Sequence, residues 1–202
     1  MRIVILENSG QVYTCQVYLV LGASSRLEDV NTLVDVGQDP AILASVARAP
    51  TGVGKWPVEQ VVLTHDHSDH CALLPRIREA FHPKVFAFSP HVEGVDCLLR
   101  DGDTIRMGDG DFEVIHTPGH SSDSICLYNE AEGVLFAGDS PLLITARGTY
   151  EEDFLAALDK LCTRDVRTIY FGHGAPLTER CNERLRESQR IASGGYAVLG
   201  RV

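Results

Sequence analysis

The chain has 202 residues, of which 44% are hydrophobic and 23% charged, and its formal net charge is −10. This length suits one fairly large domain, and we predict a single domain over residues 1–202. The apolar content excludes a disordered chain. The sequence contains neither an apolar run long enough for a membrane span nor the Lys/Arg-rich run typical of nucleic-acid binding.

The cysteines and the first residues indicate in which cellular compartment the protein is expected. Six cysteines are scattered along the chain, and no two of them form a Cys-x-x-Cys pair. This scatter argues against both a disulfide framework and a thiolate zinc site. Residues 1–7 are apolar but too short for a signal peptide. We therefore expect a cytoplasmic protein.

The first half of the chain alternates short apolar runs with helical patterns. Strands are predicted at residues 2–6, 12–21, 33–37, 61–63 and 85–88. Asp39 and Pro40 predict a helix start, with Asp39 as the N-cap and Pro40 at the first helical position. A second helix is predicted from Leu74 to about Phe81. Residues 89–100 are ambiguous, with a short helix as one interpretation.

The second half again begins with strands and ends with helices. Strands are predicted near residues 104–107, 112–117, 124–128, 134–138 and 168–171. Thr149 and Glu152 fit a capping box, and the helix behind them would bury Phe154, Leu155, Leu158, Leu161 and Cys162. A polar helix is expected from about Thr178 to Ala192. This order predicts an α/β fold in which two packed sheets carry helices on their outer faces, although periodicity alone does not prove that arrangement.

A dense cluster of polar side chains follows the apolar strand 61–63. The segment is His65-Asp66-His67-Ser68-Asp69-His70. His65 and His67 point the same way if the backbone is extended. Imidazole and carboxylate groups are the ligands that a borderline metal such as zinc prefers. The segment therefore predicts one half of a metal site.

Three further strand ends each offer one more metal-binding group. His120 follows a Pro-Gly pair, Asp139 follows a glycine, and His173 lies between two glycines. Each of them alone is a weak signal. Together with the first cluster they are what a metal cleft at one edge of a sandwich would need.

The series Thr-His65-x-His67-x-Asp69-His70, Pro-Gly-His120, Gly-Asp139 and Gly-His173 resembles the metallo-β-lactamase superfamily. The order and approximate spacing match from Asp35 to His173. The resemblance implies a four-layer αβ/βα sandwich of two mixed sheets with helices outside, and a site at one edge of the sheets.

Position by position, the resemblance implies two metal sites. The first would use His65, His67 and His120, the second would use Asp69, His70 and His173, and Asp139 would bridge both metals. Asp35 matches a family position that supports the ligands from behind. Gln38 departs from the family, which commonly has a glycine there.

The chemistry that the resemblance implies is metal-dependent hydrolysis. Two divalent ions about 4 Å apart lower the pKa of a bridging water towards about 7, and the resulting metal-bound hydroxide attacks an acyl or phosphoryl centre. Asp69 is the expected catalytic residue, which orients this water or accepts its proton. We expect zinc, with iron or manganese also compatible with the ligands. The expected substrate is a small molecule with a thioester, lactone or related acyl bond, not a nucleic acid, and a homodimer stays open.

Departures from subfamily patterns leave several alternatives. An aspartate, Asp139, stands where secreted lactamases with a cysteine ligand have that cysteine, and His67 stands where flavodiiron proteins have a glutamate. The tyrosine that follows the bridging aspartate in acyl-homoserine lactonases is replaced by Ser140-Pro141-Leu142-Leu143. Glyoxalase II enzymes carry a helical C-terminal domain, for which little chain remains after His173. Short glyoxalase-II-like proteins lack that domain, so the resemblance to a small glyoxalase-II-like hydrolase of thioesters stands. An iron-dependent persulfide dioxygenase, a phosphodiesterase or nuclease, and a non-catalytic metal-binding protein stay open.

The remaining polar residues receive mostly structural interpretations. His116 is expected to be a satisfied core or surface histidine, His82 and His91 surface residues, and Cys71 a small packed residue. Asp66 and Asp123 are expected to point away from the site or to cap turns. Segments 8–11, 50–57 with Trp56, and 141–150 with Tyr150 are candidates for lining the cleft. The apolar tail 194–200 would form an extra strand or meet a partner subunit.

Overall fold

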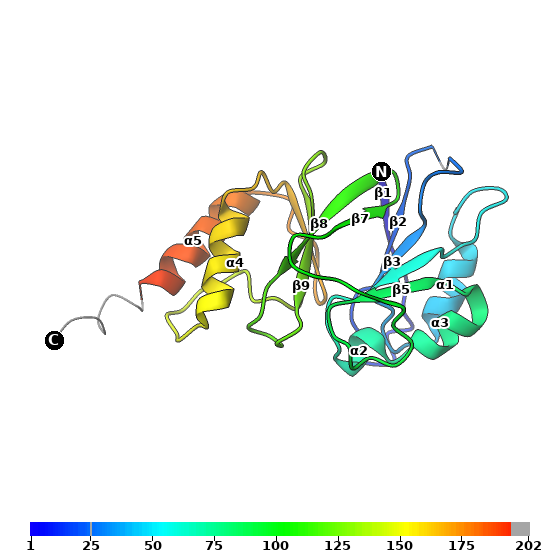
Figure 1. The fold of residues 1–202 in the computed structure, drawn as a ribbon, viewed down its shortest axis with the longest axis horizontal. Coiled ribbons are helices and arrows are strands. Elements are labelled where there is room, and N and C mark those ends of the chain that lie inside the picture. Colours follow the sequence, from blue (N-terminus) through cyan, green and yellow to red (C-terminus); the bar gives the residue numbers. More distant parts are fainter. Residues whose placement is uncertain (25, 195–202) are drawn as a thin grey trace.

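The fold was analysed in a computed structural model, which describes residues 1–24 and 26–194. Within these ranges two sheets face each other (Figure 1). The first sheet has the order β1 (Arg2–Ile5), β2 (Tyr18–Leu21), β3 (Thr32–Val34), β4 (Gln60–Val62), β5 (Lys84–Ala87) and β6 (Cys97–Leu98). The second has the order β11 (Thr168–Phe171), β10 (Val134–Gly138), β9 (Ile125–Asn129), β8 (Gly110–His116) and β7 (Thr104–Met107).

Both sheets are mixed, as the predicted fold class requires. In the first sheet β1, β2 and β3 pair antiparallel, whereas β3, β4, β5 and β6 pair parallel. In the second sheet only the β10–β11 pair is parallel. The prediction of an α/β sandwich with two mixed sheets is therefore confirmed.

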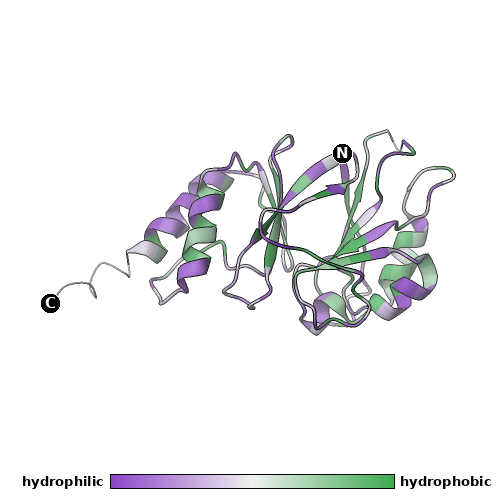
Figure 2. Ribbon diagram, viewed as in Figure 1, coloured by the Kyte–Doolittle hydropathy of each residue, from purple (hydrophilic) through white to green (hydrophobic). Residues whose placement is uncertain are grey.

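Helices cover the outer face of each sheet (Figure 1). On the first sheet lie α1 (Ala41–Arg48) and α3 (Leu74–Phe81), and on the second lie α4 (Glu152–Cys162) and α5 (Cys181–Ser193). Helix α2 (Ser68–Cys71) is a single turn that the sequence did not predict. Figure 2 shows hydrophobic strands at the centre and a largely hydrophilic surface on α5.

Three apolar layers follow from the alternation of side chains along the strands. Leu19 and Leu21 pack with α1 and α3, while their neighbours Tyr18 and Val20 face the other sheet. The layer between the sheets contains Phe112 and Phe136, and a third layer joins the second sheet to α4 and α5. Three layers of apolar contact hold four layers of secondary structure together.

The first difference from the prediction is in the strand expected at residues 12–21, which is observed only at Tyr18–Leu21. The backbone before it bonds to other segments instead of to a sheet partner. The N–H of Cys15 donates to the carbonyl of Asp69 at 3.1 Å, and that of Gln16 donates to the carbonyl of Gly172 at 2.6 Å. The strand expected at 33–37 likewise ends at Val34.

The helix starts also differ from their predictions. The capping box is wrong, because Glu151 has an extended backbone with ψ of 145° and α4 begins only at Glu152. Thr149 therefore lies too early in the chain to cap the first turn. Before α1, Pro40 occupies the N-cap position, but the Asp39 carboxylate still accepts the N–H of Ala41 at 3.0 Å.

Residues 89–100 also differ from the short helix considered for them. Residues 89–100 form turns and the short strand β6, which pairs parallel with β5, and no helix. The tail beyond Gly194, for which an extra strand or a subunit contact was considered, lies outside the described residues. In the part of the chain that is described, no helix has the length and apolar character needed to span a membrane.

The two sheets meet at the edge where the polar motifs lie. The carboxyl ends of the parallel pairs β3–β4 and β10–β11 both reach this edge. There the carbonyl of Thr64, after β4, accepts the N–H of Ile125, the first residue of β9, at 2.9 Å. This bond joins the first sheet to the second beside the candidate ligands.

We predict that Phe136→Ala lowers the free energy of unfolding by about 3–5 kcal/mol, as expected when a large buried ring leaves a cavity. Phe136 is 1% exposed and its ring lies 5.4 Å from that of Tyr18 and 5.2 Å from that of Tyr170. Urea unfolding measures the change. Leu27→Ala, at a side chain that is 81% exposed, should change stability by less than about 0.5 kcal/mol. Equal effects of the two variants would contradict this packing.

Candidate metal centre

The structure brings all seven predicted ligands to one place. They follow the ends of four strands, with His65, His67, Asp69 and His70 after β4, His120 after β8, Asp139 after β10, and His173 after β11. The parallel pairing of β10 with β11 explains why Asp139 and His173 lie at the same edge. The turn of α2 brings Asp69 and His70 back towards the strand end from which His65 and His67 project.

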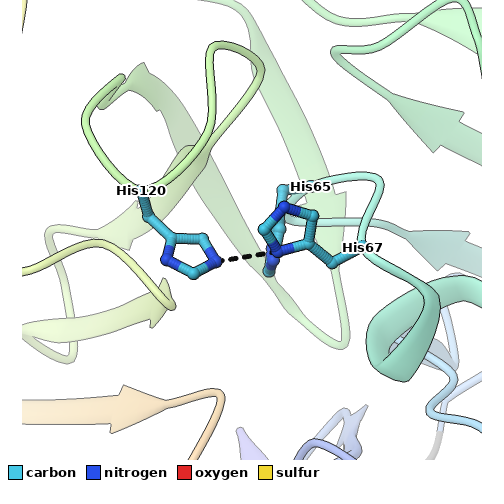
Figure 3. Close-up of side chains that lie close together, drawn as sticks. All are labelled: His65, His67 and His120. Carbon is cyan, nitrogen blue, oxygen red and sulfur yellow. Dashed lines mark hydrogen bonds between the residues drawn. The ribbon is translucent and has the colours of Figure 1, made fainter.

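Three histidines form the first ligand set. The candidate ligand atoms of His65, His67 and His120 all lie within 4.8 Å of one another. Figure 3 shows His120 approaching from its own loop towards the other two, with its Nε2 2.9 Å from Nδ1 of His67. His65 is buried, whereas His67 and His120 are exposed. The set is therefore open to solvent on one side.

The second set combines Asp69, His70 and His173, whose candidate ligand atoms also lie within 4.8 Å of one another. Nε2 of His173 lies 3.0 Å from Oδ2 of Asp69, and Nε2 of His70 lies 3.7 Å from the same oxygen. His70 is fully buried and the other two are half-buried.

Asp139 lies between the two sets. Its Oδ1 is 3.3 Å from Nε2 of His70, and its Oδ2 is 3.6 Å from Nε2 of His120 and 3.5 Å from Nε2 of His173. One carboxylate thus faces a histidine of the first set and two histidines of the second. This is the position that a ligand shared by two ions would occupy.

Asp35 holds this arrangement from behind. Its buried carboxylate accepts the backbone N–H of Thr64 at 2.8 Å, the hydroxyl of Thr64 at 2.9 Å and Nδ1 of His70 at 2.8 Å. A carboxylate can only accept, so Nδ1 of His70 carries the proton. In the neutral ring Nε2 then presents its lone pair to the site, which is the usual function of a carboxylate behind a ligating histidine.

Buried atoms without partners test whether the site fits a metal. Within the described residues, Nε2 of His65, Nε2 of His70 and Oδ1 of Asp139 are buried and have no hydrogen-bond partner. Their candidate ligand atoms lie within 4.8 Å of one another. Each unpaired buried polar atom costs about 1–3 kcal/mol. Cations held by the two sets on either side of Asp139 would remove this cost for all three atoms, so the residues fit metal ions.

The protonation of the histidines is compatible with this interpretation. Burial lowers the pKa of His65 to about 4, and burial also lowers the pKa of His120. Both rings are therefore neutral near pH 7, the form that binds metals. Burial opposes a charge on His70, but the nearby carboxylates of Asp35 and Asp139 raise its pKa. The same carboxylates would favour a metal cation.

A cavity of about 230 Å³ opens onto the site and is lined by His120, Gly138, Asp139, Ser140, Phe171 and His173. Gly172 borders the ligands closely. A Cβ atom at this position would lie 2.1 Å from Oδ1 of Asp139 and 2.6 Å from Cε1 of His70. The absence of a side chain here is what allows β11 to approach the two ligands.

The other residues singled out in the sequence lie outside the centre. His116 stacks on Phe88 with ring centroids 4.2 Å apart, and its Nε2 donates to the carbonyl of Ser122 at 2.8 Å. His82 and His91 are exposed, as expected. Sγ of Cys71, a partly buried residue, donates to the carbonyl of Asp66.

Both flanking aspartates point away from the site, as expected. The side chain of Asp66 accepts a hydrogen bond from the hydroxyl of Ser89, and that of Asp123 accepts one from the hydroxyl of Ser121. They therefore hold neighbouring turns and contribute no group to either ligand set.

The structure corrects one expectation about the cleft wall and adds one residue to it. Trp56 is not beside the cleft, because its carbonyl accepts the side chain of Asn31, just before β3, whereas the ligands lie beyond the opposite ends of β3 and β4. Tyr13, which the sequence analysis missed, stacks on His173 with ring centroids 5.1 Å apart. No motif surrounds Tyr13, so only the folded loop could identify it.

The sequence profile of the metallo-beta-lactamase superfamily matches residues 11–173, most of the chain. The chain belongs to the metallo-β-lactamase superfamily. An atrochrysone carboxyl ACP thioesterase from Aspergillus fumigatus is 30% identical over 153 residues, covering 67% of this chain and 36% of that protein. A hydroxyacylglutathione hydrolase from Rhizobium etli is 29% identical over 147 residues, covering 69% and 56%. The chain therefore spans only about a third to just over half of the length of these curated relatives.

The likeness extends to a solved structure of the same fold. The protein TTHA1623, solved in a di-iron-bound form, aligns with a TM-score of 0.66 at 22% sequence identity, over 94% of this chain and 98% of that chain. At this level of identity the match establishes the shared fold and agrees with the two mixed sheets described above.

We predict that Gly172→Ala reduces bound metal to well below the wild-type amount in the folded protein, because the added methyl group displaces Asp139 or His70. Elemental analysis and circular dichroism measure metal content and folding. Gly174→Ala is the matched control, since its φ of +88° makes alanine strained but no atom lies within 4 Å. Normal metal content in the Gly172 variant would show that this close approach is not required.

A second prediction concerns the support behind the ligands. Asp35→Asn should weaken metal affinity about 10- to 100-fold, because the amide cannot accept Nδ1–H of His70 and both hydrogen bonds from Thr64 at once. Competition with a chromophoric chelator measures the affinity. Asp66→Asn, which changes a carboxylate directed at Ser89, should retain wild-type affinity. Equal metal affinities in the wild type, Asp35→Asn and Asp66→Asn would show that Asp35 does not support the ligands.

Proposed function

We propose that this chain is a metal-dependent hydrolase that holds two divalent ions and cleaves thioester bonds of small molecules. The observation that carries the proposal is the position of Asp139 between two ligand sets, with three buried atoms unpaired at their junction. His65, His67 and His120 would hold one ion, Asp69, His70 and His173 the other, and Asp139 both.

When bound, two such ions supply a reactive water at neutral pH and polarise the carbonyl of the substrate. Asp69 is the residue of this chain best placed to handle the proton of that water. Its Oδ2 lies 3.0 Å from Nε2 of His173, at the half-buried side of the second set. His70 keeps its orientation through Asp35, and Asp139 fixes the spacing of the two sets.

The relatives support a thioester as the bond that is cleaved. One is named as a thioesterase acting on an acyl carrier protein and the other as a hydrolase of an acylglutathione, in which the acyl group is joined to a thiol. In such a reaction the oxygen of water bonds to the acyl carbon and the C–S bond breaks. The products are a carboxylic acid and a thiol. The cavity lined by His120, Asp139 and His173, which borders both sets, leaves space for the acyl group.

The identity of the metal is a separate question. Imidazole and carboxylate ligands accept zinc, iron and manganese alike, and a protein of the same fold holds two irons. We propose zinc. Elemental analysis of protein purified anaerobically without added metal tests this, and about two zinc ions per chain are expected. About one iron per chain would instead favour the oxidoreductase alternative and call for an oxygen-consumption assay.

We predict that His65→Ala and Asp139→Ala each lose bound metal and thioester hydrolysis, because each variant removes an atom from the junction of the two sets. His82→Ala, an exposed residue at the end of α3, is the control and should change neither. Hydrolysis of S-acyl glutathione and S-acyl pantetheine is followed by thiol release, before and after chelation and with metal restored. Full metal content and full activity in the His65 variant would reject the site assignment.

A further inference from the structure

Tyr13 lies against the candidate metal centre. It stands on the loop between β1 and β2, and its ring stacks on that of His173 with centroids 5.1 Å apart and an interplanar angle of 18°. Its hydroxyl lies 3.4 Å from Nε2 of His173. The residue is 73% exposed. Tyr13 therefore lies beside His173 while most of its side chain stays in contact with solvent.

The backbone on both sides of Tyr13 is tied to the segments that carry the ligands. The N–H of Cys15 donates to the carbonyl of Asp69 at 3.1 Å, and that of Gln16 donates to the carbonyl of Gly172 at 2.6 Å. The side chain of Gln38 donates to the carbonyl of Tyr13 itself. The loop is therefore positioned by the site, and the place of Tyr13 beside His173 is set by several bonds.

The hydroxyl of Tyr13 lies beside the atom of His173 that faces the other ligands. That atom, Nε2, is 3.0 Å from Oδ2 of Asp69 and 3.5 Å from Oδ2 of Asp139. If Nε2 of His173 ligates an ion, its lone pair can no longer accept the Tyr13 hydroxyl. The O–H group then remains at the mouth of the site with its hydrogen available for another acceptor.

We propose that Tyr13 is a catalytic residue whose hydroxyl donates a hydrogen bond to the acyl oxygen of the substrate. This inference rests on the proposed hydrolase function. As the oxygen of water bonds to the acyl carbon, the π electron pair of the carbonyl moves onto the acyl oxygen and makes it negative. A donor placed there binds this oxygen more strongly than it binds the neutral carbonyl. When the C–S bond breaks, the pair returns and Tyr13 has kept its proton throughout.

A purely structural role for Tyr13 makes a different prediction. If the ring only supports His173 by stacking, then Tyr13→Phe keeps that contact and should leave kcat and metal content unchanged. Tyr13→Ala, which removes the ring, should lower metal content. If the hydroxyl contacts the substrate, Tyr13→Phe should lower kcat with metal content unchanged. Val12→Ala, at a 41% exposed neighbour on the same loop, controls for disturbance of the loop.

The experiment measures kcat and KM for S-acetyl glutathione, metal content, and the Kd of acetate for the metal-loaded protein by calorimetry. We expect Tyr13→Phe to lower kcat about 10- to 100-fold, below the largest effects known for such donors because Tyr13 is exposed to water. Metal content should stay at the wild-type value and the Kd of acetate should rise. Val12→Ala should match the wild type in all four quantities.

The outcomes separate this inference from the proposed function. Wild-type kcat and wild-type acetate affinity in Tyr13→Phe would overturn the role of Tyr13 and leave the hydrolase proposal intact. A wild-type protein that binds metal but hydrolyses no thioester would reject the thioester proposal. In that case the ratio of acetate affinities of the wild type and Tyr13→Phe would still decide whether the hydroxyl faces a bound oxyanion.

Discussion

The buried carboxylate of Asp35 is the interaction on which the rest of the site depends. It joins the end of β3 to the end of β4 through Thr64, and it fixes the ring of His70 through Nδ1. Its backbone has a φ of 59°, which a non-glycine residue adopts only at a cost. Three hydrogen bonds offset that cost. As a result, the ring of His70 is held in one orientation, with Nε2 directed at the centre of the site.

The site also links the two halves of the molecule. His65, His67 and His70 follow a strand of the first sheet, whereas Asp139 and His173 follow strands of the second. The hydrogen bond between Thr64 and Ile125 holds the two edges together. Because atoms from both sheets are unpaired at their junction, a bound cation would bond to both and stabilise their contact. Metal binding and the packing of the sheets should therefore be coupled.

Most strands and helices were predicted close to their observed positions, whereas the start of one strand and the start of one helix were not. The apolar strands around residues 61–63 and 134–138 and the helix from Leu74 lie close to their predicted positions. The strand expected from residue 12 begins only at Tyr18, because the backbone N–H groups of Cys15 and Gln16 donate hydrogen bonds to the segments that carry the candidate ligands. The capping box at Thr149 fails because the helix begins later in the chain, which short motifs alone do not decide.

The sequence by itself determined the candidate ligand types, their order along the chain and the kind of fold, because dense histidine and aspartate motifs at strand ends have few other uses. Only the tertiary structure decided how these residues lie relative to one another. It placed Asp139 between the two sets, Gly172 against the ligands, Tyr13 over His173, and Trp56 at the opposite end of the first sheet. These relations join residues far apart in the chain. They follow from strand order and loop anchoring, which no local pattern encodes.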